Sequence, residues 1–266
     1  MEGKEMRKSE KQETVTTPES KELFKTECLV IPGHGIEFVG EEGNGKWKPT
    51  RLVQGIDDKG WRTGKRNPGL DDEKAIVGGG NAVVLAGAQY FRDLEKSGSL
   101  PRLVIFAAGR AGYLEKSAPD DPLLCEGVPM MESFEKETSA TELIGKDGVV
   151  IISGTKTTRD DVERSIELAV SKGLTKIAFL LLELRLERAS VFWEIMKKER
   201  PELASLDVRF LAAEDFLKER YKNHPELVDK ILSEFKSSKA FGKTDEAEKG
   251  GAQAAREGKY TGKGKY

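Results

Sequence analysis

The sequence is poor in the residues that usually form metal and redox sites. It contains only two cysteines, Cys28 and Cys125, and only two histidines, His34 and His224. Neither cysteine belongs to a C-x-x-C or a Cys/His pattern, which is what zinc sites and redox motifs require. The spacing therefore predicts free thiols and no protein-bound metal.

Long apolar runs and an excess of charge of one sign are also missing. No run approaches the roughly 20 apolar residues that cross a bilayer, and the N-terminus is rich in Lys and Glu instead of carrying an apolar signal core. Charged residues make up 34% of the chain, yet the net charge is only −2. This balance argues against general attraction to nucleic acid or membranes. We expect a cytoplasmic protein whose oligomeric state the sequence leaves open.

Apolar segments alternate with amphipathic segments along most of the chain. The predicted strands are 27–31, 103–108, 149–152, 176–181 and 206–211, and the predicted helices cover about 81–96, 132–144, 158–171, a segment ending at 196, 215–221 and 225–235. This order predicts a Rossmann-like α/β fold, with a doubly wound, mostly parallel sheet of about five strands and helices on both faces. The run 149–152 reads as a central, buried strand, and 206–211 as an edge strand.

The domain organisation follows from composition. We expect a disordered N-terminal segment over 1–24, one α/β domain over 25–235, and an unstructured C-terminal tail over 236–266, because both ends are poor in apolar residues. Residues 34–80 show no sustained period and form a long irregular insertion or lid. A connection of this length is usually functional or mobile.

The segment 149–161 gives the clearest indication of a site. A strand is followed by a Gly turn and by Thr158, and Asp161 three residues later resembles the acidic partner in a capping box. The loop lies at the carboxyl end of the strand, where open α/β sheets bind ligands. We therefore expect a ligand site at this edge.

Three hydroxyls lie beside this helix start. Thr155, Thr157 and Thr158 could bind an anion together with the free backbone N–H groups, or Thr158 could simply cap the helix. Asp160 and Asp161 would repel a fully charged phosphate. The segment therefore favours a carboxylate or a hydroxyl-rich ligand over a triphosphate.

Further candidates follow the first two strands. His34, in the turn after Gly33, could act as a general acid or base, or could simply be a solvated loop residue. Gly109 would allow a ligand to approach the backbone. Arg110 could bind an anion or face water.

Arg185 and Arg188 lie one helical turn apart at the same edge of the predicted sheet. Their guanidinium groups suit a carboxylate or a phosphate. The alternative is a local salt bridge to Glu183 or Glu187.

Basic and aromatic residues interleave over 45–67. Such a segment could stack bases and follow phosphates, or could fold over the crevice as a lid with Trp47 and Trp61 as anchors. The glycines at 78–80 lack the spacing of a dinucleotide or P-loop motif, but could bind an anion at the start of the next helix.

Three motifs together resemble the YdcF-like family (domain of unknown function 218). They are Ala107-Ala108-Gly109, the segment 155–161, and Arg185-Leu186-Glu187-Arg188-Ala189, where the family usually has Ser-Gly-Gly, Ser-x-Asn-Thr-x-Glu-Asn and His-x-x-Arg-Ala. The resemblance covers roughly residues 100–195. It implies a Rossmann-like fold, and S-adenosylmethionine binding is associated with one branch of the family.

Three hypotheses result. The first is a protein that binds a small nucleoside-bearing ligand such as S-adenosylmethionine, with transferase activity left open. The second is a phosphoester hydrolase with His34 as acid or base. The third is a nucleic-acid or protein-binding module that works through 45–67. The resemblance ranks the first hypothesis ahead of the others.

Overall fold

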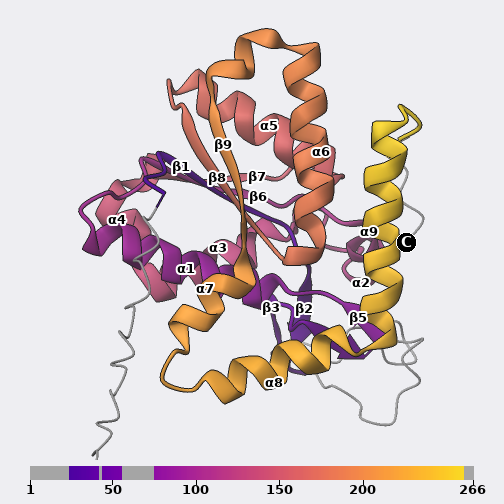
Figure 1. Ribbon diagram of the computed structural model, residues 1–266. Coiled ribbons are helices and arrows are strands. Elements are labelled where there is room, and N and C mark those ends of the chain that lie inside the picture. The colour runs from indigo at the N-terminus through magenta and orange to yellow at the C-terminus, as the bar shows by residue number, and fades with distance from the viewer. Residues whose placement is uncertain (1–23, 42–43, 56–74, 261–266) are drawn as a thin grey trace, which may run out of the picture.

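A parallel sheet forms the centre of the molecule (Figure 1). The computed structural model describes residues 24–41, 44–55 and 75–260, and within these ranges five strands form this sheet in the order β7-β6-β1-β8-β9. The strands are β1 (Cys28–Pro32), β6 (Leu103–Ala107), β7 (Val149–Ile152), β8 (Lys176–Leu181) and β9 (Asp207–Ala212). All four neighbouring pairs are parallel. The predicted α/β fold is confirmed.

Helices cover both faces of the sheet. On one face lie α1 (Gly80–Lys96), α3 (Gly127–Thr138) and α7 (Ala213–Arg220), and on the other lie α5 (Thr158–Ser171) and α6 (Glu183–Glu199). The shorter helical segments are α2 (Gly112–Ser117), α4 (Ala140–Ile144) and the 3-10 turns Lys146–Gly148 and Pro201–Ser205. The predicted helix 132–144 is thus divided between α3 and α4, where Ser139 adopts a left-handed conformation with φ 53°.

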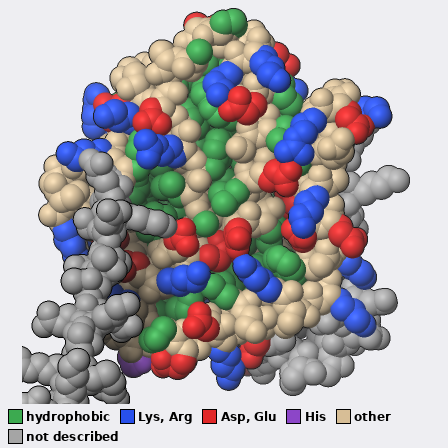
Figure 2. Space-filling view, viewed as in Figure 1, with side chains coloured by type: hydrophobic (Ala, Val, Ile, Leu, Met, Phe, Trp, Pro, Cys, Tyr) green, Lys and Arg blue, Asp and Glu red, His purple; other side chains and the backbone are tan. Residues whose placement is uncertain are grey.

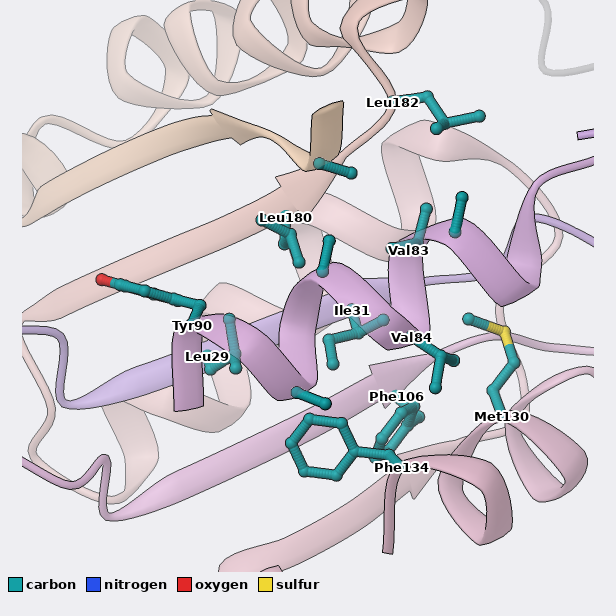
Figure 3. Packing of buried hydrophobic residues seen from close by; sticks show 14 of the residues in the cluster. Leu29, Ile31, Val83, Val84, Tyr90, Phe106, Met130, Phe134, Leu180 and Leu182 are labelled. Carbon is teal, nitrogen blue, oxygen red and sulfur yellow. The ribbon is translucent and has the colours of Figure 1, made fainter. Parts of the chain in front are cut away.

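β1 shows why the sheet is buried on both sides. Leu29 and Ile31 point into the core below α1, whereas Cys28 and Val30 point into the core below α5 and α6. Successive side chains of a strand alternate between its faces, so a continuous apolar run fills both cores. Figure 3 shows Leu29 and Ile31 packed beneath α1. In the same core the rings of Phe106 and Phe134 meet edge to face, with their centroids 5.5 Å apart.

The position of β7 corrects one prediction. We expected 149–152 to be the central strand, buried on both faces, but it lies at the edge of the sheet and is only partly buried. Its apolar residues reflect the helices packed beside it and not a second neighbouring strand. The prediction of an edge strand at 206–211 is confirmed by β9.

The segment 34–80 is more regular than expected. Its described parts form two antiparallel pairs, β2 (Ile36–Val39) with β3 (Lys46–Pro49) and β4 (Val53–Gly55) with β5 (Ala75–Val77). Trp47 packs edge to face on Phe38 across the first pair at 5.6 Å. The remainder of the predicted lid, including Trp61, lies outside the described residues.

The C-terminal region also differs from the prediction. α8 (Pro225–Lys236) is followed by α9 (Lys239–Arg256), so the expectation of an unstructured tail from residue 236 is wrong for most of that region. α9 lies along α6 (Figure 1), with Ala252 and Ala255 packed on Val191 and Phe192. Alanines at this spacing are a weak apolar signal, which is why composition alone indicated disorder. The expected N-terminal disorder concerns residues that lie, except for Phe24, outside the described ranges.

Charges of both signs are interspersed over the face shown in Figure 2, as the balanced composition predicts. None of the described helices is both long enough and apolar enough to cross a membrane.

Candidate functional site

The strand order places the ligand edge between β1 and β8. The chain passes from β1 to β6 on one side, and β8 lies on the other side of β1. In open α/β sheets such a reversal leaves a crevice at the carboxyl ends of the two strands. After β1 the chain turns at Gly33, His34 and Gly35, and Gly35 has φ 94°. This turn brings His34 to the point where the crevice is expected.

His34 is the most unusual residue at this edge. Its side chain is buried, with 2% of the residue exposed, and neither ring nitrogen has a hydrogen-bond partner in the described part of the chain. The alternative of a solvated loop histidine is therefore wrong. Burial lowers the pKa of His34 well below its usual value, and the positive charge of Arg185 lowers it further. The imidazole is therefore neutral at physiological pH.

Thr50 fastens the His34 turn to the start of α1. Its hydroxyl donates to the carbonyl oxygens of His34 and Gly35, both at 3.1 Å, and accepts from the N–H groups of Gly79 at 3.0 Å and Gly80 at 3.3 Å. The helix start that could have bound an anion is thus used by a side chain of the protein. No pattern in the sequence indicated this role of Thr50.

Glu126 is a second residue that sequence reasoning missed. One carboxylate oxygen accepts from the N–H of Gly35 at 2.9 Å, and the other accepts from the hydroxyl of Tyr113 at 2.9 Å. The Tyr113 hydroxyl in turn accepts from the N–H of Ile36 at 2.8 Å. Glu126 therefore places a carboxylate directly against the turn that carries His34.

Thr155 and Gly109 join the ends of β7 and β6. The N–H of Gly109 donates to the Thr155 hydroxyl at 3.0 Å, and a Cβ at Gly109 would lie 1.8 Å from the Thr155 carbonyl oxygen. Gly109 is thus required by the close approach of another loop, whereas the sequence indicated approach of a ligand.

Asp161 lies in the same region. Burial and the negative charges of Glu126 and Asp160 raise the pKa of Asp161 to about 8, although a hydrogen bond with Thr155 and the charge of Arg185 oppose the shift. The carboxyl group is thus largely protonated at neutral pH, and it can either donate or accept a hydrogen bond. The charges of Glu126, Asp160 and Arg185 thus act on the Asp161 carboxyl group at this edge.

The helix cap of α5 is one residue earlier than predicted. Thr157 accepts from the N–H of Asp160 at 3.1 Å, and the Asp160 carboxylate accepts from the N–H of Thr157 at 3.1 Å. The predicted pair of Thr158 and Asp161 is wrong, because Thr158 is already the first helical residue. The shift leaves the Asp161 side chain outside the capping box.

Arg110 holds the loop that follows β6. Its guanidinium group donates to four carbonyl oxygens, those of Asp121, Leu124, Leu114 and Ala118. Its donors are thus directed at the protein backbone, and the structure gives Arg110 a role in shaping the loop that leads to Glu126.

Arg185 and Arg188 extend from the first turns of α6. Arg185 donates from Nη1 to the carbonyl oxygen of Gly33 at 3.0 Å, and its Nε lies 3.6 Å from an oxygen of Glu248. Arg188 donates to Glu248 at 3.2 Å and to the hydroxyl of Tyr260 at 3.1 Å. Both arginines are therefore paired with a carboxylate that comes from α9.

The local salt bridges that we considered for these arginines do not form. Glu183 pairs with Lys236 and Glu187 with Arg256, each at 2.7 Å. The first N–H of α6, that of Glu183, is instead bound by the buried carboxylate of Glu214 at 2.9 Å. Since α9 was not predicted, Glu248 could not be identified from the sequence.

A separate apolar cavity of about 450 Å³ lies between α1, α7 and α8. Its lining includes Leu85, Leu217 and Ile231, and none of the predicted site residues. Both cysteines are buried free thiols, as predicted, and no three His, Cys, Asp or Glu side chains in the described ranges are grouped as metal ligands.

The chain matches no family model, and no curated protein matches it. The fold and the site geometry therefore define the class of protein that this is: a Rossmann-like α/β protein with polar residues gathered at the switch point of its sheet. The similarity to the YdcF-like family stays a prediction.

Proposed function

We propose that this protein binds a small nucleoside-bearing molecule between the carboxyl ends of β1 and β8, with S-adenosylmethionine as the first candidate. The observation that carries the proposal is His34. Buried polar groups in proteins are almost always hydrogen-bonded, and an unsatisfied one costs about 1–3 kcal/mol. A buried imidazole without a protein partner among the described residues is explained if a ligand supplies the hydrogen bond.

The charges around His34 fit such a ligand. Asp161 can hydrogen-bond the hydroxyls of a ribose, and Arg185 and Arg188 suit the carboxylate of an amino acid. Because Glu126 and Asp160 place negative charge at the same edge, a triphosphate is disfavoured, as it was from the sequence. The resemblance to the YdcF-like family supports an adenosyl ligand independently. Bound S-adenosylmethionine would supply an activated methyl group.

The hydrolase hypothesis is less well supported. A general acid must carry a proton at working pH, whereas burial and Arg185 hold the pKa of His34 below its usual value. The neutral imidazole of His34 can still act as a general base. We therefore place ligand binding ahead of phosphoester hydrolysis, and leave open whether the bound molecule reacts.

The described part of the proposed binding module at 45–67 includes Lys46, Trp47, Lys48 and Arg51. Trp47 packs on Phe38 and against the main core, so this indole stabilises the β2–β3 pair. The basic residues that follow Trp61 lie outside the described ranges.

The test is thermal stabilisation against S-adenosylmethionine, S-adenosylhomocysteine, nucleotides and sugar nucleotides. A ligand at a hundred times its Kd adds about 2.7 kcal/mol of stability, which raises Tm by a few degrees. We expect an adenosyl ligand to stabilise the wild type and the His224→Leu variant, but not His34→Leu. Equal stabilisation of His34→Leu, or no shift with any member of the panel, would refute the proposal.

A further inference from the structure

Glu248 binds both arginines of the candidate site from outside the sheet. Its oxygens lie 3.6 Å from Nε of Arg185 and 3.2 Å from Nη1 of Arg188, and only 5% of its side chain is exposed. A carboxylate between two guanidinium groups is the arrangement that a bound carboxylic acid would adopt. The chain therefore carries its own carboxylate in the place where a ligand's carboxylate would bind.

The helix that carries Glu248 packs on α6 through small side chains. Its apolar contacts to α6 come from Ala252 and Ala255, and alanine buries little apolar area. Gly250 and Gly251 follow Glu248 within one turn, and glycine is the poorest helix former after proline. The ion pair with Glu248 therefore joins α9 to α6 together with a second ion pair, Arg256 with Glu187 at 2.7 Å, near the C-terminal end of α9.

Arg185 connects this ion pair to the predicted ligand site. Its Nη1 binds the carbonyl oxygen of Gly33, the residue before His34, while its Nε faces Glu248. A ligand bound at His34 would therefore be linked to Glu248 through the side chain of Arg185. Two carboxylates competing for the same guanidinium groups repel each other, and the one that loses its partners must return to water.

We propose that Glu248 is an internal occupant of the anion subsite formed by Arg185 and Arg188, and that the carboxylate of the ligand displaces it and releases α9 from α6. This inference rests on the proposed function, because it assigns the carboxylate end of the same ligand. The proposal makes the carboxylate of the ligand a determinant of which ligands the protein binds. It also makes α9 the element that responds to binding.

Hydrogen exchange of α9 in the full-length protein tests whether Glu248 occupies the anion subsite and holds α9 on α6. This measurement needs no adenosyl ligand. Glu248→Gln removes the charge, and Glu246→Gln is the matched control because Glu246 is exposed on the same helix. We expect α9 to exchange about tenfold faster in Glu248→Gln than in the control. Inorganic phosphate should also speed exchange of α9 in the wild type, relative to sodium chloride of equal ionic strength.

The affinities for two related ligands test whether the carboxylate of the ligand displaces Glu248. S-adenosylhomocysteine carries the carboxylate, whereas 5′-methylthioadenosine lacks the amino-acid end. Because the apparent Kd rises when the competent state is rare, Glu248→Gln should bind S-adenosylhomocysteine about tenfold more tightly than the wild type does. Its affinity for 5′-methylthioadenosine should stay unchanged.

Gly251→Leu provides a second variant that keeps Glu248 intact. A Cβ at Gly251 would lie 3.2 Å from Cδ of Arg188, so a leucine side chain there would crowd the contact between α9 and α6. We expect the same faster exchange and the same tighter binding as in Glu248→Gln.

Equal exchange of α9 in Glu248→Gln and Glu246→Gln would overturn the inference, as would binding of S-adenosylhomocysteine that leaves exchange of α9 unchanged. If neither adenosyl ligand binds any variant, the proposed function fails. The exchange measurements with phosphate then decide separately whether the two arginines form an anion subsite that Glu248 fills.

Discussion

Arg185 donates a hydrogen bond from Nη1 to the carbonyl oxygen of Gly33 at 3.0 Å and thereby joins the start of α6 to the turn after β1. The two residues are 152 positions apart in the sequence. Their contact bridges the switch point of the sheet and places the positive charge of Arg185 beside His34.

Replacing His34 by leucine should separate stability from binding. The change removes a buried polar ring whose nitrogens have no partner among the described residues, so the free energy of unfolding without ligand should stay the same or rise by about 1 kcal/mol. Binding of the adenosyl ligand should be lost. Urea denaturation and calorimetric titration measure the two effects, with His224→Leu as control. A large loss of stability would show that His34 has a structural partner.

Asp161 should make stability fall as the pH rises. A carboxyl group with a pKa of about 8 in the folded state holds its proton between about pH 4 and pH 8, whereas the unfolded chain has released it. The folded state then binds more protons, so the free energy of unfolding decreases with pH by up to about 1.4 kcal/mol per unit and levels off above pH 8.

Asp161→Asn isolates this effect. Below pH 6.5 the lowered pKa of His34 acts in the opposite direction, because the unfolded histidine takes up a proton that the folded one does not. The comparison is therefore clearest between pH 6.5 and pH 8. Denaturation curves should show a slope in the wild type and little slope in the variant. Parallel curves would mean that Asp161 is ionised in the folded protein.

Thr157→Ala should destabilise α5 by about 1 kcal/mol, because it removes the hydroxyl that caps the helix. Thr158→Ala is the natural comparison, since Thr158 is the first helical residue and makes no capping bond. We expect its effect to stay within about 0.5 kcal/mol. Chemical denaturation of both variants checks the assignment, and the reverse order would restore the cap predicted from the sequence.

Gly109→Ala should cost about 2–3 kcal/mol, because the new Cβ would meet the Thr155 carbonyl oxygen and the two loops would have to separate. Gly112→Ala is the control, since a Cβ at that position meets nothing within 4 Å. The difference in urea midpoint between the two variants measures the effect. Equal midpoints would show that the loops after β6 and β7 are not in close contact.

The sequence predicted most helices and strands well, but it predicted less well which of them lie next to one another. The strands, most helices and the carboxyl edge follow from local apolar patterns, which is why His34 and Arg185 were found. The position of β7 at the edge depends on which strands pair, and four apolar residues read the same in either place. The capping hydroxyl depends on whether the residue before the helix is Thr157 or Thr158, a difference too fine for periodicity.

Glu126 and Glu248 were not identified from the sequence for a different reason. Glu126 and Glu248 act on the site from segments that are far away in the chain, 91 residues from Gly35 and 60 from Arg188. Acidic residues are common in this sequence, so no local pattern distinguishes these two from solvated ones. Only the folded arrangement shows that each is buried against the site.

The most direct test of a ligand at the switch point is the side-chain nitrogen NMR spectrum of the protein labelled with ¹⁵N-histidine. With only His34 and His224 in the chain, the two rings can be assigned from His34→Leu. On titration with S-adenosylmethionine or S-adenosylhomocysteine, we predict that the ring nitrogens of His34 shift as they gain a hydrogen-bond partner, while those of His224 stay in place. A His34 spectrum that remains unchanged at saturating concentrations of both ligands would contradict the account.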